Sequence, residues 1–244
     1  MVTSTDSLDI LQRGKITVRG EFVWGSNYTF LVEVESEGGP LQAVYKPTRG
    51  ERPLWDFPVA SLAKREAAAY WVSQSLGWDL VPPTVYRTKG PVGAGSLQLY
   101  IEHDPEYHYF NFKDEDRQRL RPVVLFDLLI NNADRKGSHI LVDADRRLWL
   151  IDHGVCFHIE EKLRTVIWDF VGEPIPNTLL VDLHLFSQKL LVSSAAPDNL
   201  NHNLVRWLSQ GEIRALARRA RDLVEEGCYP APKPNRRPYP WPAI

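Results

Sequence analysis

NNADRKGSHILVDADRRLWLIDHG, residues 131–154, is the stretch that decides the fold. Its apolar runs HILVD and RLWLID have the composition of short strands, and ADRR between them has the polar residues of a tight hairpin turn. Antiparallel pairing would set the start of the first strand beside the end of the second. We therefore expect His139 and Asp152 to lie within side-chain reach of each other, with Asp134 in the preceding loop at the same end.

The composition limits the class of protein. The chain has 244 residues, a hydrophobic share of 43% and a net charge of −2, which suits one large or two small packed domains. Charges of both signs are interspersed, so we expect no nucleic acid partner. Cys156 and Cys228 are far apart and could form at most one disulfide. With no signal peptide and no apolar run near the roughly 20 residues that span a bilayer, a cytoplasmic protein without transmembrane segment is expected.

The first hundred residues alternate apolar and polar side chains in the way that half-buried strands do. The expected strands are residues 15–24, 28–36, 41–47, 84–88 and 96–103. The first three form an antiparallel meander with turns between them. Between the third and fourth strands, residues 59–77 are predicted to form a helix that ends at Gly77. This part of the chain is thus predicted to contain five strands and one helix.

Beyond residue 106 the pattern becomes helical. Residues 115–131 carry apolar side chains nearly all round, as expected of a helix buried inside a lobe. Further helices are expected at residues 177–191, 203–208 and 209–227. In the last of these, Ser209 and Glu212 form a capping box and Gly227 marks the end. The proline-rich tail, residues 229–244, should be extended, either as a strap packed on the protein or as a peptide ligand.

A strand-rich part, a short connection and a helical part with a loop and a hairpin make up the layout of a protein kinase. We therefore predict an α+β, bilobal, protein-kinase-like fold. Its N-lobe would hold an antiparallel sheet and one helix, and its C-lobe would be mostly helical with the catalytic loop and the hairpin. The predicted boundaries are 10–102 for the N-lobe, 103–106 for the hinge, 107–228 for the C-lobe and 229–244 for the tail.

The spacing of polar residues supports this fold. In protein kinases, a metal-binding Asn stands five positions after the catalytic Asp, and a hairpin then delivers a second metal-binding Asp before a Gly. Here His139 stands five positions after Asp134, and the hairpin delivers Asp152 in DHG. Upstream, Lys46 ends the third strand and Glu66 lies in the first helix, like the kinase Lys and Glu that pair over the nucleotide phosphates.

The segments FDLLINNADRKGSHIL and LIDHG resemble the catalytic segment of phosphatidylinositol 3-/4-kinases and of HipA-type bacterial kinases. The pattern YKPTRGERPLWDFP, followed by REAAAYWVSQSLGW and VPPTV, is similar to an uncharacterised bacterial family related to those kinases. The resemblance covers about residues 10–228. It implies a phosphotransferase that binds ATP or GTP with Mg²⁺ or Mn²⁺. The phosphoacceptor could be a protein, a small molecule or a lipid.

The resemblance also implies roles for individual residues. Lys46 would hold the α- and β-phosphates and Glu66 would orient Lys46. Asp134 would be the catalytic base, and Asp152 a metal ligand. The segment that would pack against the nucleobase consists of Gln98, Leu99, Tyr100, Ile101 and Glu102.

The sequence departs from the kinase pattern at two places. His139 replaces the usual Asn, and an imidazole ligand makes Mn²⁺ plausible beside Mg²⁺. There is also no G-x-G-x-x-G loop. The turn that could instead present backbone N–H groups to phosphate consists of Gly25, Ser26 and Asn27. Arg49 and Arg52 in the following loop could clamp a phosphate or be solvated charges.

Two other functions stay open. The fold could be a catalytically silent, kinase-like module for nucleotide binding or interaction, which His139 and the missing phosphate loop favour. A metal-dependent phosphohydrolase could use His139, Asp152, His153 and His158, but it leaves Lys46 and Glu66 unexplained. The kinase interpretation makes geometric predictions that the phosphohydrolase interpretation does not make. Lys46, Asp134 and Asp152 should face one cavity between the lobes, and Lys46 should form an ion pair with Glu66.

Overall fold

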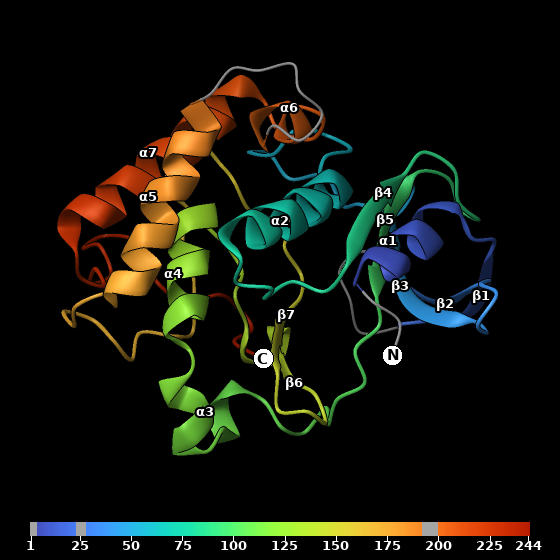
Figure 1. The fold of residues 1–244 in the computed structure, drawn as a ribbon, viewed down its shortest axis with the longest axis horizontal. Coiled ribbons are helices and arrows are strands. Elements are labelled where there is room, and N and C mark those ends of the chain that lie inside the picture. Colours follow the sequence, from blue (N-terminus) through green and yellow to red (C-terminus); the bar gives the residue numbers. More distant parts are fainter. Residues whose placement is uncertain (1–3, 23–27, 192–199) are drawn as a thin grey trace.

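The computed structural model describes residues 4–22, 28–191 and 200–244. An antiparallel sheet lies at one side of the molecule and a helical body at the other, with helix α2 (Leu62–Leu76) between them (Figure 1). This arrangement confirms the predicted α+β, two-part architecture.

The sheet contains five antiparallel strands in the order β1-β2-β3-β5-β4. The strands are β1 (Ile16–Glu21), β2 (Phe30–Val34), β3 (Leu41–Pro47), β4 (Thr84–Arg87) and β5 (Gly95–Leu99). All five expected strands are present, and the first three form the predicted meander. Alternation along the strands places Val32, Ala43, Tyr45 and Leu97 in one buried cluster. The sheet therefore has its own small core.

The structure contains a helix, α1 (Ser4–Arg13), before the first strand. The sequence predicted only one helix in this part of the chain, so that prediction is wrong. Leu11 of α1 is fully buried in the core of the sheet. Arg87 of β4 donates from Nη1 to the carbonyl oxygen of Gly14, at 2.6 Å, just beyond the end of the helix. A helix this short is marginal alone and depends on packing, which a local pattern does not report. The predicted N-lobe boundary at residue 10 falls inside it.

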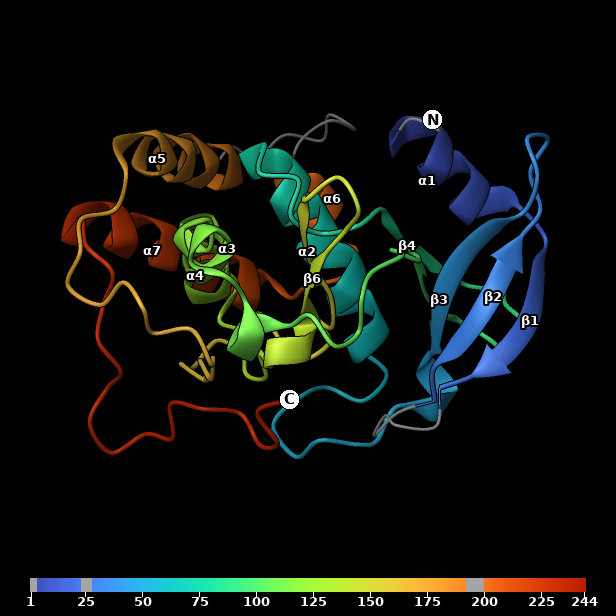
Figure 2. The same ribbon diagram turned by 90° about the horizontal axis from the view of Figure 1, so that it is seen from below.

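The helical body is built from α3 (Asp114–Gln118), α4 (Arg121–Ile130), α5 (Asn177–Leu191), α6 (Leu200–Leu204) and α7 (Gln210–Glu226). Helix α5 packs along α7, and α4 lies against α7 (Figures 1 and 2). The capping box predicted for α7 is present, because Ser209 N donates to Glu212 Oε2 at 2.7 Å and Ser209 Oγ accepts from Glu212 N. Gly227 ends the helix in the left-handed region, with φ of 65°.

The single helix predicted for residues 115–131 is wrong, because the structure contains two helices there, α3 and α4. The break falls at Arg119 and Leu120, directly before the first turn of α4, which contains Pro122. A proline has no N–H to continue the hydrogen-bond ladder, and its ring would clash with the carbonyl of Gln118 in a continuous helix. The proline is tolerated in a first turn, so a new helix begins there.

Helix α2 belongs to both parts of the molecule. Its N-terminus is capped from the preceding loop, where the Glu51 carboxylate accepts from the backbone N–H groups of Leu62 and Ala63 at 3.2 and 2.9 Å. One face adjoins β4 and β5, while other residues of the helix join the large core of the helical body. Arg65, almost fully buried, donates from Nη2 to Glu212 Oε1 of α7 at 2.5 Å. This ion pair fixes α2 to the helical body.

The tail beyond Gly227 has no helix or strand and packs on the protein as a strap, the first of the two predicted alternatives. Residues 228–244 run along the helical body and return toward the hairpin (Figure 2). The carbonyl oxygen of Pro238 accepts from Thr165 N at 2.9 Å, and that of Ala243 accepts from Gly137 N at 2.8 Å. Across the described ranges, no helix has the length and apolar character needed to cross a membrane.

Candidate functional site

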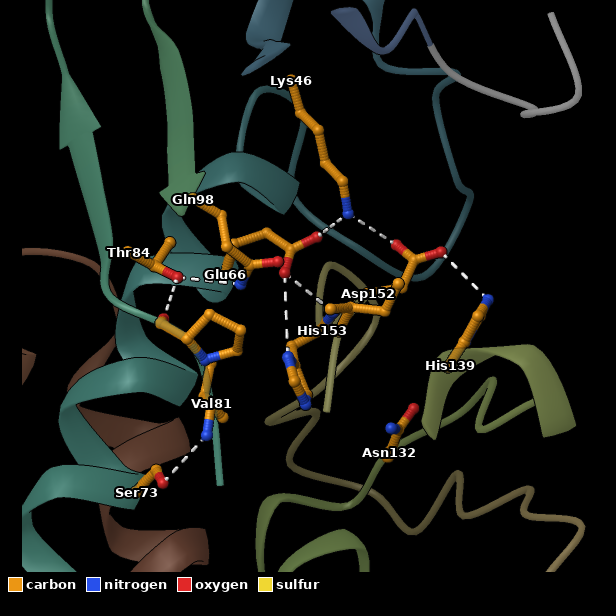
Figure 3. Close-up of polar contacts among 12 residues, drawn as sticks. Lys46, Glu66, Ser73, Val81, Thr84, Gln98, Asn132, His139, Asp152 and His153 are labelled. Atoms are coloured by element: carbon orange, nitrogen blue, oxygen red, sulfur yellow. Dashed lines mark hydrogen bonds and ion pairs between the residues drawn. The ribbon is translucent and has the colours of Figure 1, made fainter. Parts of the chain in front are cut away.

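The hairpin that opened the sequence analysis is present. Strands β6 (Ile140–Val142) and β7 (Leu148–Leu150) pair in antiparallel register, with Ile140 opposite Leu150. His139 ends a 3-10 turn directly before β6, and its carbonyl oxygen accepts from Ile151 N at 3.1 Å. Nε2 of His139 consequently lies 3.3 Å from Oδ2 of Asp152 (Figure 3). The predicted proximity of these two side chains is confirmed.

Lys46 links three elements at one point. Its Nζ lies 2.6 Å from Glu66 Oε1 on α2 and 3.0 Å from Asp152 Oδ1 after the hairpin (Figure 3). Glu66 is held in turn, because its Oε2 accepts from the backbone N–H of His153 at 2.8 Å. The ion pair predicted between Lys46 and Glu66 is therefore present.

A cavity of about 130 Å³ lies at this junction. It is lined by Lys46, Glu66, Asp134 and Asp152, as the sequence predicted for three of these residues. The volume is below the roughly 300 Å³ at which sites for whole small molecules begin. The cavity alone is therefore too small for a whole molecule of nucleotide size.

Burial and neighbouring charges set the protonation of the four polar side chains. Burial opposes the charge on Lys46, but the carboxylates of Asp152 and Glu66 outweigh it and raise the pKa of Lys46. The Lys46 charge lowers the pKa of Asp152, which stays ionised. Burial raises the pKa of Asp134 to about 6 and lowers the pKa of His139 to about 4. At neutral pH the site thus combines the Lys46 cation and the neutral imidazole of His139 with three carboxylates. These belong to Glu66, Asp134 and Asp152.

The backbone at the site is unusual at two positions. Asp152 and Asn131 adopt left-handed conformations, with φ of 65° and 57°. Such conformations are costly for residues other than glycine and persist where surrounding contacts enforce them. At Asp152 the enforcing contacts are its ion pair with Lys46 and the hydrogen bond of the next residue, His153, to Glu66.

Arg135, to which the sequence analysis assigned no role, holds several segments of the site together through hydrogen bonds. Its fully buried guanidinium donates to both carboxylate oxygens of Asp127 on α4, at distances down to 2.9 Å. It also donates to the carbonyl oxygens of His139 and Ile151, at 3.1 and 2.9 Å. A signal was available, because an aspartate in an apolar helix needs a buried partner. Arg135 therefore connects α4 to the residues that directly precede β6 and directly follow β7.

His153 was considered only as a phosphohydrolase ligand, and the structure gives it other contacts. It is fully buried, and its Nε2 lies 2.9 Å from Arg135 Nη2. Burial lowers the pKa of His153 well below its ordinary value, so the ring is neutral and accepts this hydrogen bond. His158 instead hydrogen-bonds the backbone of Glu160. The described residues contain no group of three or more His, Cys, Asp or Glu side chains able to hold a metal.

The residues predicted for the nucleobase do not line the cavity at Lys46. Gln98 lies in β5 and donates from Nε2 to Thr84 Oγ1 at 2.8 Å (Figure 3). The following residues, Leu99, Tyr100, Ile101 and Glu102, lead into the connection to the helical body. Arg49 and Arg52 are also outside the cavity lining. The predicted phosphate turn, Gly25 to Asn27, lies outside the described residues. The roles of all these residues stay predictions.

Together, the sheet, the linking helix, the buried Lys–Glu pair and the loop with its hairpin define a protein-kinase-like fold. Solved structures of kinases share it at low sequence identity. The Golgi casein kinase with Mn/ADP bound has a TM-score of 0.57 and 15% identity over 91% of this chain and 74% of that chain. Hydra Fam20 with sugar has a TM-score of 0.55 and 16% identity over 91% and 88%. The Helicobacter pylori proinflammatory kinase CtkA has a TM-score of 0.52 and 11% identity over 90% and 94%.

Within this fold class, the chain belongs to the family of Protein Rv2133c of Mycobacterium tuberculosis. The two are 38% identical over 279 residues, which cover 100% of this chain and 98% of that protein. Phosphatidylinositol 4-kinase gamma 4 of Oryza sativa subsp. japonica is 26% identical over 185 residues, covering 62% of this chain and 32% of that protein. No family model matches the sequence.

Proposed function

We propose that the protein is a kinase-like phosphotransferase that binds ATP or GTP with a divalent metal between the sheet and the hairpin. One observation carries the proposal, the position of Lys46 Nζ between Glu66 and Asp152, at 2.6 and 3.0 Å. Phosphoryl transfer depends mainly on positioning and on neutralising phosphate charge. A partly buried lysine, Lys46, held by the helix glutamate Glu66 beside the proposed metal ligand Asp152, supplies both.

Lys46 is the proposed ligand of the α- and β-phosphates, and Glu66 orients it. Because Glu66 is also held by the His153 backbone N–H, the protein itself fixes the position of the lysine. A preorganised cation need not reorganise during the reaction, which is a main source of electrostatic catalysis. The cavity at Lys46 would receive the phosphates, while the base and sugar would lie outside it.

Asp152 and His139 are the proposed metal ligands. The donor set fits a divalent ion, since Asp152 is ionised, His139 is neutral and their side chains lie 3.3 Å apart. A nucleotide-bound ion takes its other ligands from phosphates and water, so two protein ligands suffice. When bound, the ion would neutralise charge on the phosphates. An imidazole nitrogen suits later transition metals better than Mg²⁺, which supports Mn²⁺ as an alternative.

Asp134 is the proposed general base for the acceptor hydroxyl. Its backbone N–H donates to Asn132 Oδ1 at 2.9 Å, which fixes the loop at this residue. A pKa of about 6 lies near the operating pH, where a base is both ionised and able to take a proton. Lys136 Nζ lies 3.9 Å from Asp134 Oδ2. The candidate acceptors are proteins, small molecules and lipids.

The test is nucleotide binding by calorimetry, with ATP and GTP in Mg²⁺ or Mn²⁺, together with phosphate transfer from labelled nucleotide. Lys46→Met should weaken binding at least tenfold, and Lys89→Met on the exposed loop after β4 should leave it unchanged. Absence of nucleotide binding under all four conditions would overturn the proposal. Tight binding without turnover on protein, metabolite or lipid acceptors would instead identify a silent nucleotide-binding module.

A further inference from the structure

A second cavity, of about 440 Å³, lies on the helical body. Its walls are the end of α4, residues 159–168, the C-terminal half of α7 and residues 230–238 of the strap. Among the described residues, it shares no lining residue with the cavity at Lys46. Its volume falls in the range of about 300 to 1,000 Å³ that is typical of small-molecule sites.

One part of the wall is apolar. It consists of Leu128, Ile159, Leu163, Leu223 and Pro232, from four separate segments of the chain. Aliphatic and proline side chains of this kind bury the hydrocarbon or ring portion of a ligand.

The other part of the wall is charged, with four basic residues, Arg218, Arg219, Lys233 and Arg236, and three acidic ones, Glu161, Asp222 and Glu226. Lys233 forms an ion pair with Glu161, and Arg236 donates to the Glu161 carbonyl oxygen at 2.5 Å. Arg219 of α7 forms no ion pair with any described residue. Its Nε and Nη1 donate to the backbone carbonyl oxygens of Leu129 and His158, at 2.7 and 3.2 Å. Its hydrogen bonds in the wall thus go to neutral backbone groups, while the carboxylates of Asp222 and Glu161 act on its charge without a direct contact.

Two N–H donors in this wall lack acceptors. Nη2 of Arg219 and Nε1 of Trp168 are buried and have no hydrogen-bond partner among the described residues. Native proteins leave few buried donors unsatisfied, and those that exist call for an explanation. Burial lowers the pKa of the Arg219 guanidinium to about 10, the neighbouring Arg218 charge acts in the same direction, and the carboxylates of Asp222 and Glu161 oppose the shift. An anion beside Arg219 would satisfy both the charge and the donors.

We propose that this cavity binds a small organic anion, with a carboxylate, sulfonate or phosphate group on an apolar body. The oxyanion would accept from Arg219 and Trp168, and the apolar body would pack on Leu163, Leu223 and the strap. Both the unpaired cation and the unsatisfied donors would be accounted for by one ligand class. The inference does not depend on the proposed phosphotransferase activity.

A matched pair of probes tests the requirement for an anion. The first is 8-anilinonaphthalene-1-sulfonate, and the second is N-phenyl-1-naphthylamine, which has the same rings without the sulfonate. Fluorescence titration of the full chain should show one saturable site with at least tenfold tighter binding of the sulfonate. Equal affinities, or no saturable binding, would overturn the proposal.

Variants locate the site. Trp168→Phe keeps an aromatic ring but removes the N–H, and Arg219→Gln removes the charge. Each should weaken sulfonate binding at least fivefold while leaving the neutral probe unaffected. Arg214→Gln, on the exposed face of the same helix, is the control and should change neither. If Arg219→Gln does not fold, Trp168→Phe still decides. Unchanged sulfonate binding in Trp168→Phe, or its loss in Lys46→Met, would place the probe elsewhere and refute the site.

Discussion

His139 occupies the position at which most protein kinases use an amide side chain to bind metal. Its imidazole is buried, neutral and 3.3 Å from Asp152, so it can donate a nitrogen lone pair to an ion without first losing a proton. The identity of this one side chain should therefore influence which metal supports nucleotide binding.

We expect His139→Asn to retain ATP binding and to shift its support from Mn²⁺ toward Mg²⁺, because an amide oxygen replaces the nitrogen. The measurement is the ratio of ATP affinities in the two metals, for wild type and variant. His184→Asn, on the exposed side of α5, is the control. An unchanged ratio in His139→Asn would exclude the residue as a ligand.

The two aspartates of the site should have separable roles. Asp134→Ala should lower turnover by roughly 10²- to 10⁴-fold, the range for a positioned general base, with little change in nucleotide affinity. Asp152→Asn should instead weaken binding of the metal–nucleotide pair, because a charge on the ion is lost. Affinity and turnover are measured for both variants. Equal losses of affinity would mean that the roles are wrongly divided.

At this scale, sequence could place some residues and not others. His139 and Asp152 could be predicted as neighbours because a hairpin fixes which residues face each other. Asp127 in its apolar helix signals a buried partner, but which side chain is that partner depends on how α4 packs, so Arg135 could not be assigned. Spacing reports contacts within one motif, whereas contacts between motifs need the packed core.

At the scale of elements, α2 and α7 are joined by the ion pair between Arg65 and Glu212, whose side chains are only 2% and 9% exposed. Glu212 also accepts from Ser209 at the start of α7. Burial favours the neutral acid, but the Arg65 charge and the Ser209 hydrogen bonds outweigh it and lower the pKa of Glu212 below its ordinary value. The carboxylate therefore stabilises the folded state in its ionised form.

The sign of the pH dependence follows. A folded-state pKa below the unfolded value gives stability that is present above the unfolded value and is lost as pH falls through the folded one. The melting temperature of the wild type should fall more steeply between about pH 5 and pH 3 than that of Glu212→Gln. Glu225→Gln, exposed on the same helix, should follow wild type. Parallel curves for wild type and Glu212→Gln would contradict the assignment.

Elements with strong local signals could be predicted, and those that depend on packing could not. The five strands alternate clearly, and α7 has both its capping box and its terminal glycine. Helix α1 lacks comparable signals and is stabilised on the sheet through Leu11. The break between α3 and α4 was visible as Pro122, but continuous apolar character around it favoured one helix.

At the scale of the whole molecule, the C-terminal strap contacts the loop that carries Asp134 and His139. The Ala243 carbonyl oxygen accepts from Gly137, which lies between Asp134 and His139. Deleting residues 239–244 removes this bond but keeps the one from Pro238 to Thr165. We expect lower turnover and weaker metal-dependent nucleotide binding, because the loop that carries both residues is loosened.

Thermal stability, nucleotide affinity and phosphate transfer are measured for this deletion. Tyr239→Ser is the matched control, since it alters an exposed strap side chain, 50% accessible, and retains the backbone hydrogen bond. A deletion that behaves like the control would show that the strap is not needed by the loop.

Helix α2 is poorly suited to act as an on–off switch. In many kinases, activity is controlled by moving the corresponding helix, which makes or breaks the Lys–Glu pair. Here such a movement would have to pull Arg65 from its buried pair with Glu212 and leave a carboxylate stranded inside the helical body. Under the proposed function, breaking the pair between Lys46 and Glu66 is therefore a costly way to control activity. Control of enzyme output would fall to the supply of nucleotide and acceptor rather than to a conformational signal.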